Sequence, residues 1–202
     1  MLTLHHLNRS RSTRILWLLE ELELDYTRVD HRRDAKTHLA PDSLKAVHPL
    51  GKAPVMVDGD ITLCESSTIV EYILDRYADN QLRPEHGTKE YYQYLEWSHF
   101  AEGSLSLPVI TSGLLKMETR DGQQPIDGYI AKEVYVDFSY IESVLGSRPY
   151  FAGEHFTAAD IMMTISLNMA KRSHLLDGKP NIEAYLNRIQ QRPAFQKAVS
   201  FG

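Results

Sequence analysis

The sequence predicts a small α/β domain followed by an all-helical domain, and three observations support this prediction. Strand and helix signals alternate through residues 1–79. The next segment, 80–87, is polar and contains Pro84 and Gly87, which is typical of a linker. From residue 88 to residue 202 the apolar residues recur with helical spacing. We therefore expect an α/β domain at 1–79, a linker at 80–87 and a helical domain at 88–202.

The first part of the α/β domain reads as strand, helix, strand. Leu2 and Leu4 alternate with polar neighbours, which indicates a short strand. Apolar residues between 15 and 22 then recur at i, i+3, i+4 and i+7, which predicts a helix with one buried face. Residues 26–30 indicate a second strand. This order predicts a parallel strand pair joined by a right-handed crossover.

The second part reads as a hairpin followed by a helix. Asp58-Gly59 separates two short β-type runs, 55–57 and 61–63, which is a strong hairpin signal. Helical periodicity resumes near Ser66. Adding this antiparallel pair to the parallel pair predicts a mixed four-stranded sheet.

Residues after the linker predict only helices. One apolar stripe runs over 91–105, and we expect Pro108 to kink that helix. Another stripe covers 130–145. Thr157-x-x-Asp160 has the spacing of a capping box, in which the acid closes the first turn of a helix. We therefore expect Asp160 to stabilise the helical domain rather than to take part in catalysis.

Composition narrows the function classes. The chain has 202 residues, a formal net charge of −5 and one cysteine, Cys64. An acidic balance argues against nucleic acid as the main partner, and no apolar run approaches the roughly 20 residues that span a bilayer. A single cysteine forms no intrachain disulfide, which fits a reducing compartment such as the cytoplasm. The histidines show no metal-binding spacing, so we expect no metal.

Three stretches, taken together, resemble the glutathione S-transferase family. They are HPLGKAPVMVDGDITLCESSTIVEYI at 48–73, YFAGEHFTAADI at 150–161 and RPAFQKA at 192–198. The start, LHHLNRSRSTRILWLLEEL at 4–22, is similar to one group of microbial members. The resemblance implies a thioredoxin-like N-terminal domain, an all-helical C-terminal domain, glutathione as co-substrate and usually a two-fold homodimer.

The resemblance assigns Lys52, Ala53 and Pro54 to glutathione binding. It implies a cis bond before Pro54, with the Ala53 backbone pairing with the cysteinyl part of glutathione as an added strand does. Lys52 can reach the glycine carboxylate as a point charge. The residues taken alone also allow a trans proline at a strand start and a solvated surface lysine.

Glu65 and Ser66 are the second part of the expected glutathione site. The N-terminus of a helix presents unpaired N–H groups and a partial positive charge, which suit a carboxylate. The resemblance implies that Ser66 binds the γ-glutamyl carboxylate and that Glu65 faces the ammonium group. Ser66 as a helix N-cap and Glu65 as an acid favoured by the helix dipole are also possible roles, and both are compatible with ligand binding.

The group that activates the thiol is expected in the loop after the first strand. Lowering a thiol pKa from about 8.5 by roughly two units requires about 2.7 kcal/mol. One hydrogen bond to a charged group supplies roughly 1.5–3 kcal/mol. The loop contains no tyrosine or cysteine, and Ser10 best matches the serine position of the family. Ser12 is the competitor, with an alternative role as a helix N-cap. Asn8 and backbone donors of the loop are further alternatives.

Three aromatic residues are candidates for the pocket of the second substrate. Tyr91, Tyr94 and Trp97 lie on one predicted helical stripe, which also fits a role in the core. The leading hypothesis is a transferase that joins the glutathione thiolate to an electrophilic, largely apolar small molecule. A glutathione-dependent disulfide reductase with the same site, and a non-catalytic binding or regulatory protein with this fold, are the alternatives.

Overall fold

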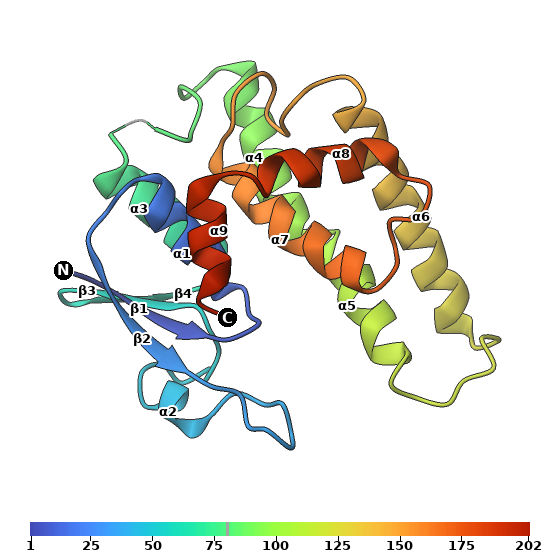
Figure 1. The fold of residues 1–202 in the computed structure, drawn as a ribbon, viewed down its shortest axis with the longest axis horizontal. Helices are drawn as coiled ribbons and strands as arrows, with labels where there is room; N and C mark the ends of the chain where they lie inside the picture. Colours follow the sequence, from blue (N-terminus) through green and yellow to red (C-terminus); the bar gives the residue numbers. More distant parts are fainter. Residues whose placement is uncertain (80) are drawn as a thin grey trace. The chain divides into compact units, whose positions relative to one another are not determined.

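The computed structural model describes residues 1–79 and 81–202, and these form two compact units (Figure 1). The first unit contains Met1–Leu82 together with Gln191–Gly202, and the second contains Arg83–Gln190. The first residue of the expected linker, residue 80, lies outside the described residues. The expected domain limits stay a prediction, but the C-terminal segment groups with the first unit rather than with the helices that precede it.

The first unit is built on a mixed four-stranded sheet, as the sequence predicts. Its strands are β1 (Leu2–Leu7), β2 (Tyr26–His31), β3 (Val55–Asp58) and β4 (Ile61–Cys64), in the order β2-β1-β3-β4. β1 and β2 are parallel, whereas β3 is antiparallel to both β1 and β4. The β3–β4 loop is Gly59-Asp60, and Gly59 has a φ of 62°, a conformation that glycine adopts without steric cost.

Helices cover this sheet because its strands carry one apolar face. In β1, Leu2, Leu4 and His6 are buried and alternate with less buried residues. α1 (Ser12–Glu21) and α3 (Ser66–Tyr77) lie on one side of the sheet, and α2 (Asp42–Lys45) lies on the other (Figure 1). The parallel β1–β2 pair joined through α1 is the predicted strand–helix–strand unit.

The last helix, α9 (Pro193–Ser200), packs against α1 and so belongs to the first unit. Phe195 meets the Trp17 ring edge-on, with ring centroids 4.9 Å apart. Arg192 donates from Nε and Nη2 to the two carboxylate oxygens of Glu21, at 2.6 and 2.7 Å. This bidentate pair and the buried ring contact explain why the chain end groups with the sheet.

The second unit contains α4 (Lys89–Gly103), α5 (Ser106–Leu115), α6 (Pro125–Leu145), α7 (Ala158–Arg172) and α8 (Pro180–Ile189). α7 is buried along most of its length and contacts α4, α5 and α8. The expected kink at Pro108 is wrong: the first helix ends at Gly103, and Pro108 is the third residue of α5. Proline is tolerated in a first turn because the N–H groups there have no partner within the helix.

The capping box at the start of α7 is confirmed. The Asp160 carboxylate accepts the N–H groups of Thr157 at 2.9 Å and Phe151 at 3.1 Å, and also the Tyr185 hydroxyl at 2.9 Å. Asp160 is fully buried, and burial raises its pKa to about 6 despite these donors. Asp160 therefore joins α7, α8 and the preceding loop, which is the structural role that the sequence predicts.

Within residues 1–79 and 81–202, the structure contains no helix that is both long enough and apolar enough to cross a membrane.

Candidate glutathione site

The sheet register gathers three separate segments at one end of the first unit. His5 of β1 lies opposite Val55, the first residue of β3, and Val55 lies opposite Cys64, the last residue of β4. The loop after β1, the segment before β3 and the turn after β4 therefore adjoin one another. These segments contain Ser10, Lys52 to Pro54, and Glu65 with Ser66.

The loop after β1 is held in one conformation by side chains that the sequence analysis did not single out. The Arg33 guanidinium donates to the carbonyls of Asn8, Arg9 and His38 at 3.2, 3.4 and 3.0 Å. The Arg33 N–H donates to the Asn8 side chain at 3.0 Å. Arg9 adopts a φ of 53°, and its N–H donates to the Gly202 carbonyl at 3.3 Å. Ser10 therefore stands on an anchored loop.

Ser10 and Ser12 differ in what they can reach. The Ser10 side chain is partly exposed, whereas Ser12 is fully buried. Their Oγ atoms are 2.7 Å apart, and the Ser12 N–H donates to Ser10 Oγ at 3.1 Å. Ser12 Oγ also accepts the Leu7 N–H at 3.2 Å. Of these two hydroxyl groups, only that of Ser10 has access to a ligand.

The expected N-cap role of Ser12 is wrong. Arg11 occupies the N-cap position of α1, and Ser12 is the first helical residue. The Ser12 hydroxyl bonds back to the end of β1 rather than to the N–H groups of its own helix. Ser10 takes the cap-like contacts instead, since Ser10 Oγ accepts the Ser12 N–H and the Ser10 carbonyl accepts the Thr13 N–H.

The segment before β3 has the conformation that the family resemblance implies. The Ala53–Pro54 peptide bond is cis, which confirms that expectation. Lys52 is exposed, Ala53 is partly exposed and Pro54 is buried. Lys52 and part of Ala53 are therefore accessible in this segment.

Glu65 and Ser66 form the start of α3. Glu65 is the N-cap residue, with a φ of 71° and a ψ of 116°, a sparsely populated conformation for a residue with a side chain. Such strain costs on the order of 1–3 kcal/mol and is concentrated at functional sites. Glu65 is exposed, while Ser66 is 3% exposed at the first helical position. The exposed Glu65 thus directly precedes the unpaired N–H groups at the start of α3.

Arg14 is a residue of this region that the sequence analysis missed. It is 1% exposed, and its Nη1 donates to Ser66 Oγ at 3.2 Å. The guanidinium adds positive charge behind the N-terminus of α3, which favours an anion there. A signal was present in the sequence: Arg14 lies four residues before Leu18 and therefore on the apolar stripe of α1.

The three aromatic candidates lie in the second unit. Tyr94 and Trp97 are fully buried, so a pocket role for them requires the core of that unit to open. Trp97 stacks on the exposed Tyr140 with ring centroids 5.1 Å apart and also contacts the buried Phe151 ring at 4.7 Å. Tyr91 is partly exposed, and its assignment to the electrophile pocket stays a prediction.

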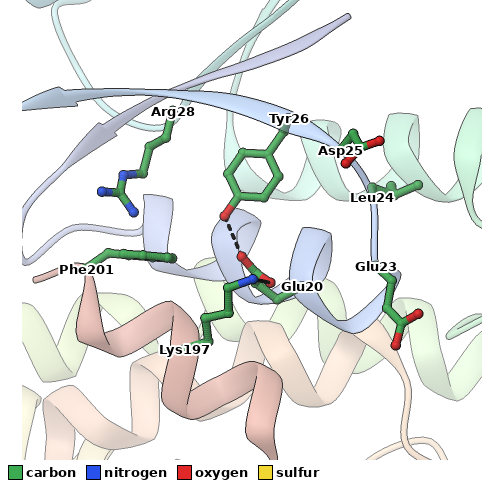
Figure 2. Close-up of a pocket in the computed structure, with 8 residues that line it drawn as sticks. All are labelled: Glu20, Glu23, Leu24, Asp25, Tyr26, Arg28, Lys197 and Phe201. Atoms are coloured by element: carbon green, nitrogen blue, oxygen red, sulfur yellow. Dashed lines mark hydrogen bonds and ion pairs between the residues drawn. The ribbon is translucent and has the colours of Figure 1, made fainter.

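A separate pocket of about 500 Å³ lies in the first unit and contains none of the predicted site residues (Figure 2). It is lined by Glu20, Glu23, Leu24, Asp25, Tyr26, Arg28, Lys197 and Phe201. Glu20 accepts the Tyr26 hydroxyl at 2.6 Å and pairs with Lys197 at 2.6 Å, and Arg28 lies over the Phe201 ring (Figure 2). These pairings connect α9 to α1 and β2, so we assign this pocket a structural role.

The fold and the gathered segments define the class of protein: a thioredoxin-like α/β unit combined with an all-helical unit. Residues 1–75 match the family model for the glutathione S-transferase N-terminal domain, and residues 112–199 match a model for the C-terminal domain. The chain belongs to the glutathione S-transferase family.

Individual relatives cover nearly the whole chain. Glutathione S-transferase 3 of Schizosaccharomyces pombe is 36% identical over 98% of this chain and 87% of its own length. A glutathione S-transferase structure from Actinobacillus pleuropneumoniae is 36% identical, with a TM-score of 0.90 over 100% of this chain and 92% of that one. A glutathione transferase family member from Pseudomonas fluorescens, with two glutathione bound, shares the fold at 21% identity and a TM-score of 0.82, covering 98% and 92% of the two chains.

Proposed function

We propose that this protein conjugates the thiolate of glutathione to an electrophilic, largely apolar small molecule. The observation that carries the proposal is the sheet register, which brings a partly exposed serine hydroxyl, an exposed ammonium group and a helix N-terminus to one end of the first unit. Glutathione has an extended shape with a thiol between two carboxylates, and these groups match its thiol and carboxylates in kind.

The two ends of glutathione are bound by charge. Lys52 pairs with the glycine carboxylate, and the Ala53 backbone pairs with the cysteinyl peptide unit. The γ-glutamyl carboxylate accepts the Ser66 N–H and hydroxyl at the start of α3, with Arg14 behind them adding positive charge. The Glu65 carboxylate faces the ammonium group.

Ser10 stabilises the thiolate by donating its hydroxyl hydrogen to sulfur. A hydrogen bond to a charged acceptor contributes roughly 1.5–3 kcal/mol, and the start of α1 adds about 0.3–1 kcal/mol. Together these are enough to lower the thiol pKa by about two units, which costs about 2.7 kcal/mol. The thiol proton leaves to solvent, the sulfur forms a bond to the electrophilic carbon, and the leaving group departs with its electron pair.

The function is tested with two substrates on the purified protein. We expect retention on immobilised glutathione and turnover of an activated aryl halide, with one halide ion released per conjugate formed. A mixed disulfide of glutathione with a small thiol serves as the competing substrate. Turnover of the disulfide alone would establish the reductase alternative, and retention without either turnover would establish a binding protein.

We also propose a cytoplasmic homodimer. The support is the family membership for the dimer and the single cysteine for a reducing compartment. Light scattering of the purified protein should give a mass near twice the monomer value, and a monomeric mass would refute the dimer.

A further inference from the structure

His6 is a buried titratable residue that takes no direct part in the proposed binding of glutathione. It is 1% exposed on the same face of β1 as Leu2 and Leu4, beneath α1. Its Nδ1 lies 2.8 Å from Ser12 Oγ. The neighbouring His5 points to the other face of the sheet, where its Nδ1 lies 3.0 Å from His31 Nε2. Two adjacent histidines thus have separate surroundings.

A chain of hydrogen bonds joins His6 to the partly exposed Ser10. It runs from His6 Nδ1 to Ser12 Oγ at 2.8 Å and from Ser12 Oγ to Ser10 Oγ at 2.7 Å. Both distances are those of well-formed hydrogen bonds. Two further donors are fixed by the backbone, since the Leu7 N–H bonds to Ser12 Oγ and the Ser12 N–H bonds to Ser10 Oγ.

Counting hydrogens along this chain determines its direction. If His6 carries its hydrogen on Nδ1, Ser12 Oγ accepts from His6 and from the Leu7 N–H, so both of its lone pairs are used. The one hydrogen of Ser12 has two acceptors within reach, Ser10 Oγ at 2.7 Å and the Leu7 carbonyl at 3.2 Å. Because Ser12 Oγ has no lone pair left, the short contact with Ser10 requires that Ser12 donate its hydrogen to Ser10. Ser10 Oγ consequently accepts two hydrogen bonds, one from the Ser12 hydroxyl and one from the Ser12 N–H. Ser10 Oγ can then form one more hydrogen bond, in which it donates its own hydrogen, and this hydrogen points away from Ser12 and His6.

The other ring nitrogen favours this tautomer. His6 Nε2 is buried and forms no hydrogen bond of normal geometry among the described residues, and the Gly202 backbone near the ring acts on it less strongly than burial does. A buried N–H without a well-formed hydrogen bond is rarer than an acceptor without one, so we place the hydrogen on Nδ1.

The ring is neutral in its surroundings. Burial lowers the pKa of His6, and the charges of Arg28 and His31 lower it further, while Asp30 and the Gly202 backbone raise it by less than burial lowers it. A neutral Nδ1–H imidazole is therefore the form present near pH 7.

We infer that His6 is a positioning residue which, through Ser12, directs the Ser10 hydroxyl hydrogen toward the sulfur of bound glutathione. This inference rests on the proposed function, because it assigns a purpose to the direction of the Ser10 hydrogen. The chain orients a hydrogen bond and transfers no proton. Without His6, the Ser12 hydroxyl is free to accept from Ser10, and the Ser10 hydroxyl then spends part of its time turned inward.

The test measures the pKa of the bound thiol from the ultraviolet absorbance of the thiolate, together with kcat and KM for glutathione. His6→Leu removes the ring nitrogen while keeping an apolar side chain of similar bulk. We expect the bound thiol pKa to rise by about one, with kcat below that pKa falling about tenfold and KM for glutathione changing less than about twofold. His6→Asn places an amide donor near the Nδ1 position, and it should restore most of the loss.

Two further variants separate positioning from packing. Ser12→Ala breaks the same chain without substituting a residue of β1, although it also removes the partner of the Leu7 N–H, and it should raise the thiol pKa as His6→Leu does. His5→Leu is the matched control, because it makes the same change one residue away on the other face and should leave the thiol pKa unchanged. If His6→Leu does not fold, nitrogen NMR of the unaltered protein still tests the tautomer: hydrogen on Nδ1 supports the inference, and hydrogen on Nε2 overturns it.

These measurements distinguish failure of the role of His6 from failure of the proposed function. If Ser10→Ala raises the thiol pKa but His6→Leu and Ser12→Ala do not, the role of His6 is overturned and the proposed function stands. If the unaltered protein does not bind glutathione, or binds it with an unshifted thiol pKa, the proposed function fails and the role of His6 fails with it.

Discussion

Two hydrogen-bonded clusters, one in each unit, show opposite designs. At the start of α7, the buried Asp160 carboxylate accepts hydrogen bonds from Phe151, Thr157 and Tyr185. All four of these residues are buried. At the start of α1, the chain from His6 through Ser12 ends at Ser10, which is partly exposed. The first cluster is closed, and the second is open at one end.

The difference indicates what each cluster is for. In a closed cluster every hydrogen-bonding group has a partner within the protein, so none is available to a ligand. Loss of the central acceptor leaves several buried donors without a partner. An open chain has fewer partners to lose, and its end is free to bind. We therefore expect changes at Asp160 to affect stability and changes at Ser10 to affect catalysis.

Asp160→Ala should have the largest effect. It leaves two backbone N–H groups without an acceptor and the Tyr185 hydroxyl with only its 3.2 Å contact to Thr164 Oγ1, and each unsatisfied group costs roughly 1–3 kcal/mol. We expect the free energy of unfolding to fall by about 3 kcal/mol or more, measured by urea denaturation. Asp127→Ala is the matched control, because Asp127 closes a capping box at the start of α6 in a more exposed place, and it should cost about 1 kcal/mol. Equal losses would contradict the comparison.

Ser10→Ala should have the next largest effect, on turnover. Loss of a hydrogen bond to the thiolate removes roughly 1.5–3 kcal/mol, which is about 10- to 150-fold in rate. Glutathione affinity should change less than about threefold, and the free energy of unfolding should fall by about 1 kcal/mol, because Ser10 Oγ accepts the Ser12 N–H at the start of α1. Steady-state kinetics with an aryl halide checks the rate. An unchanged kcat would move the activating role to a backbone donor of this loop.

The pH dependence of stability should follow Asp160. Its pKa is raised to about 6 in the folded protein, against about 3.9 in an unfolded chain. Between these values the folded state binds more protons, so the contribution of Asp160 to the free energy of unfolding decreases as pH rises from about 4 to about 6. The difference in unfolding free energy between the unaltered protein and Asp160→Asn should fall by on the order of 2 kcal/mol over this range. A difference that is flat or rises with pH would refute this assignment.

Lys52→Ala should have the smallest effect. The side chain is exposed, so solvent screens its attraction for the glycine carboxylate to about 1 kcal/mol, or roughly a fivefold rise in Kd for glutathione. Isothermal titration calorimetry measures this change. Lys132→Ala on α6 is the control, since Lys132 is also exposed and lies in the second unit. If both variants bind glutathione as the unaltered protein does, Lys52 has no carboxylate role.

Local pattern was enough to predict the sheet. The period-2 alternation at Leu2 and Leu4, the Asp58-Gly59 signal and the helical stripe before Leu22 depend only on neighbours in sequence, and each appears in the structure. The break between α4 and α5 was not predictable in this way, because the apolar stripe continues across Gly103 and Ser106 with helical spacing.

The partners within the site depend on contacts between distant residues, which a single sequence does not display. Arg33 anchors the loop of Ser10 from beyond β2, and Arg14 reaches Ser66 across 52 positions. Ser12 fits an N-cap by residue type, yet its hydroxyl bonds to His6 because the end of β1 lies against the start of α1. Residue type and spacing therefore indicated the proposed ligand-binding residues, whereas identifying the groups that contact them required the structure.

We propose that the open end of the His6–Ser12–Ser10 chain stabilises the thiolate of glutathione, and the pKa of the bound thiol is the quantity that depends on this step. Titration of the thiolate absorbance in the complex should give a pKa about two units below the 8.5 of a free thiol in the unaltered protein. In Ser10→Ala the pKa should return most of the way to 8.5. A bound thiol that titrates near 8.5 in the unaltered protein, or a lowered pKa that Ser10→Ala leaves in place, would contradict the account.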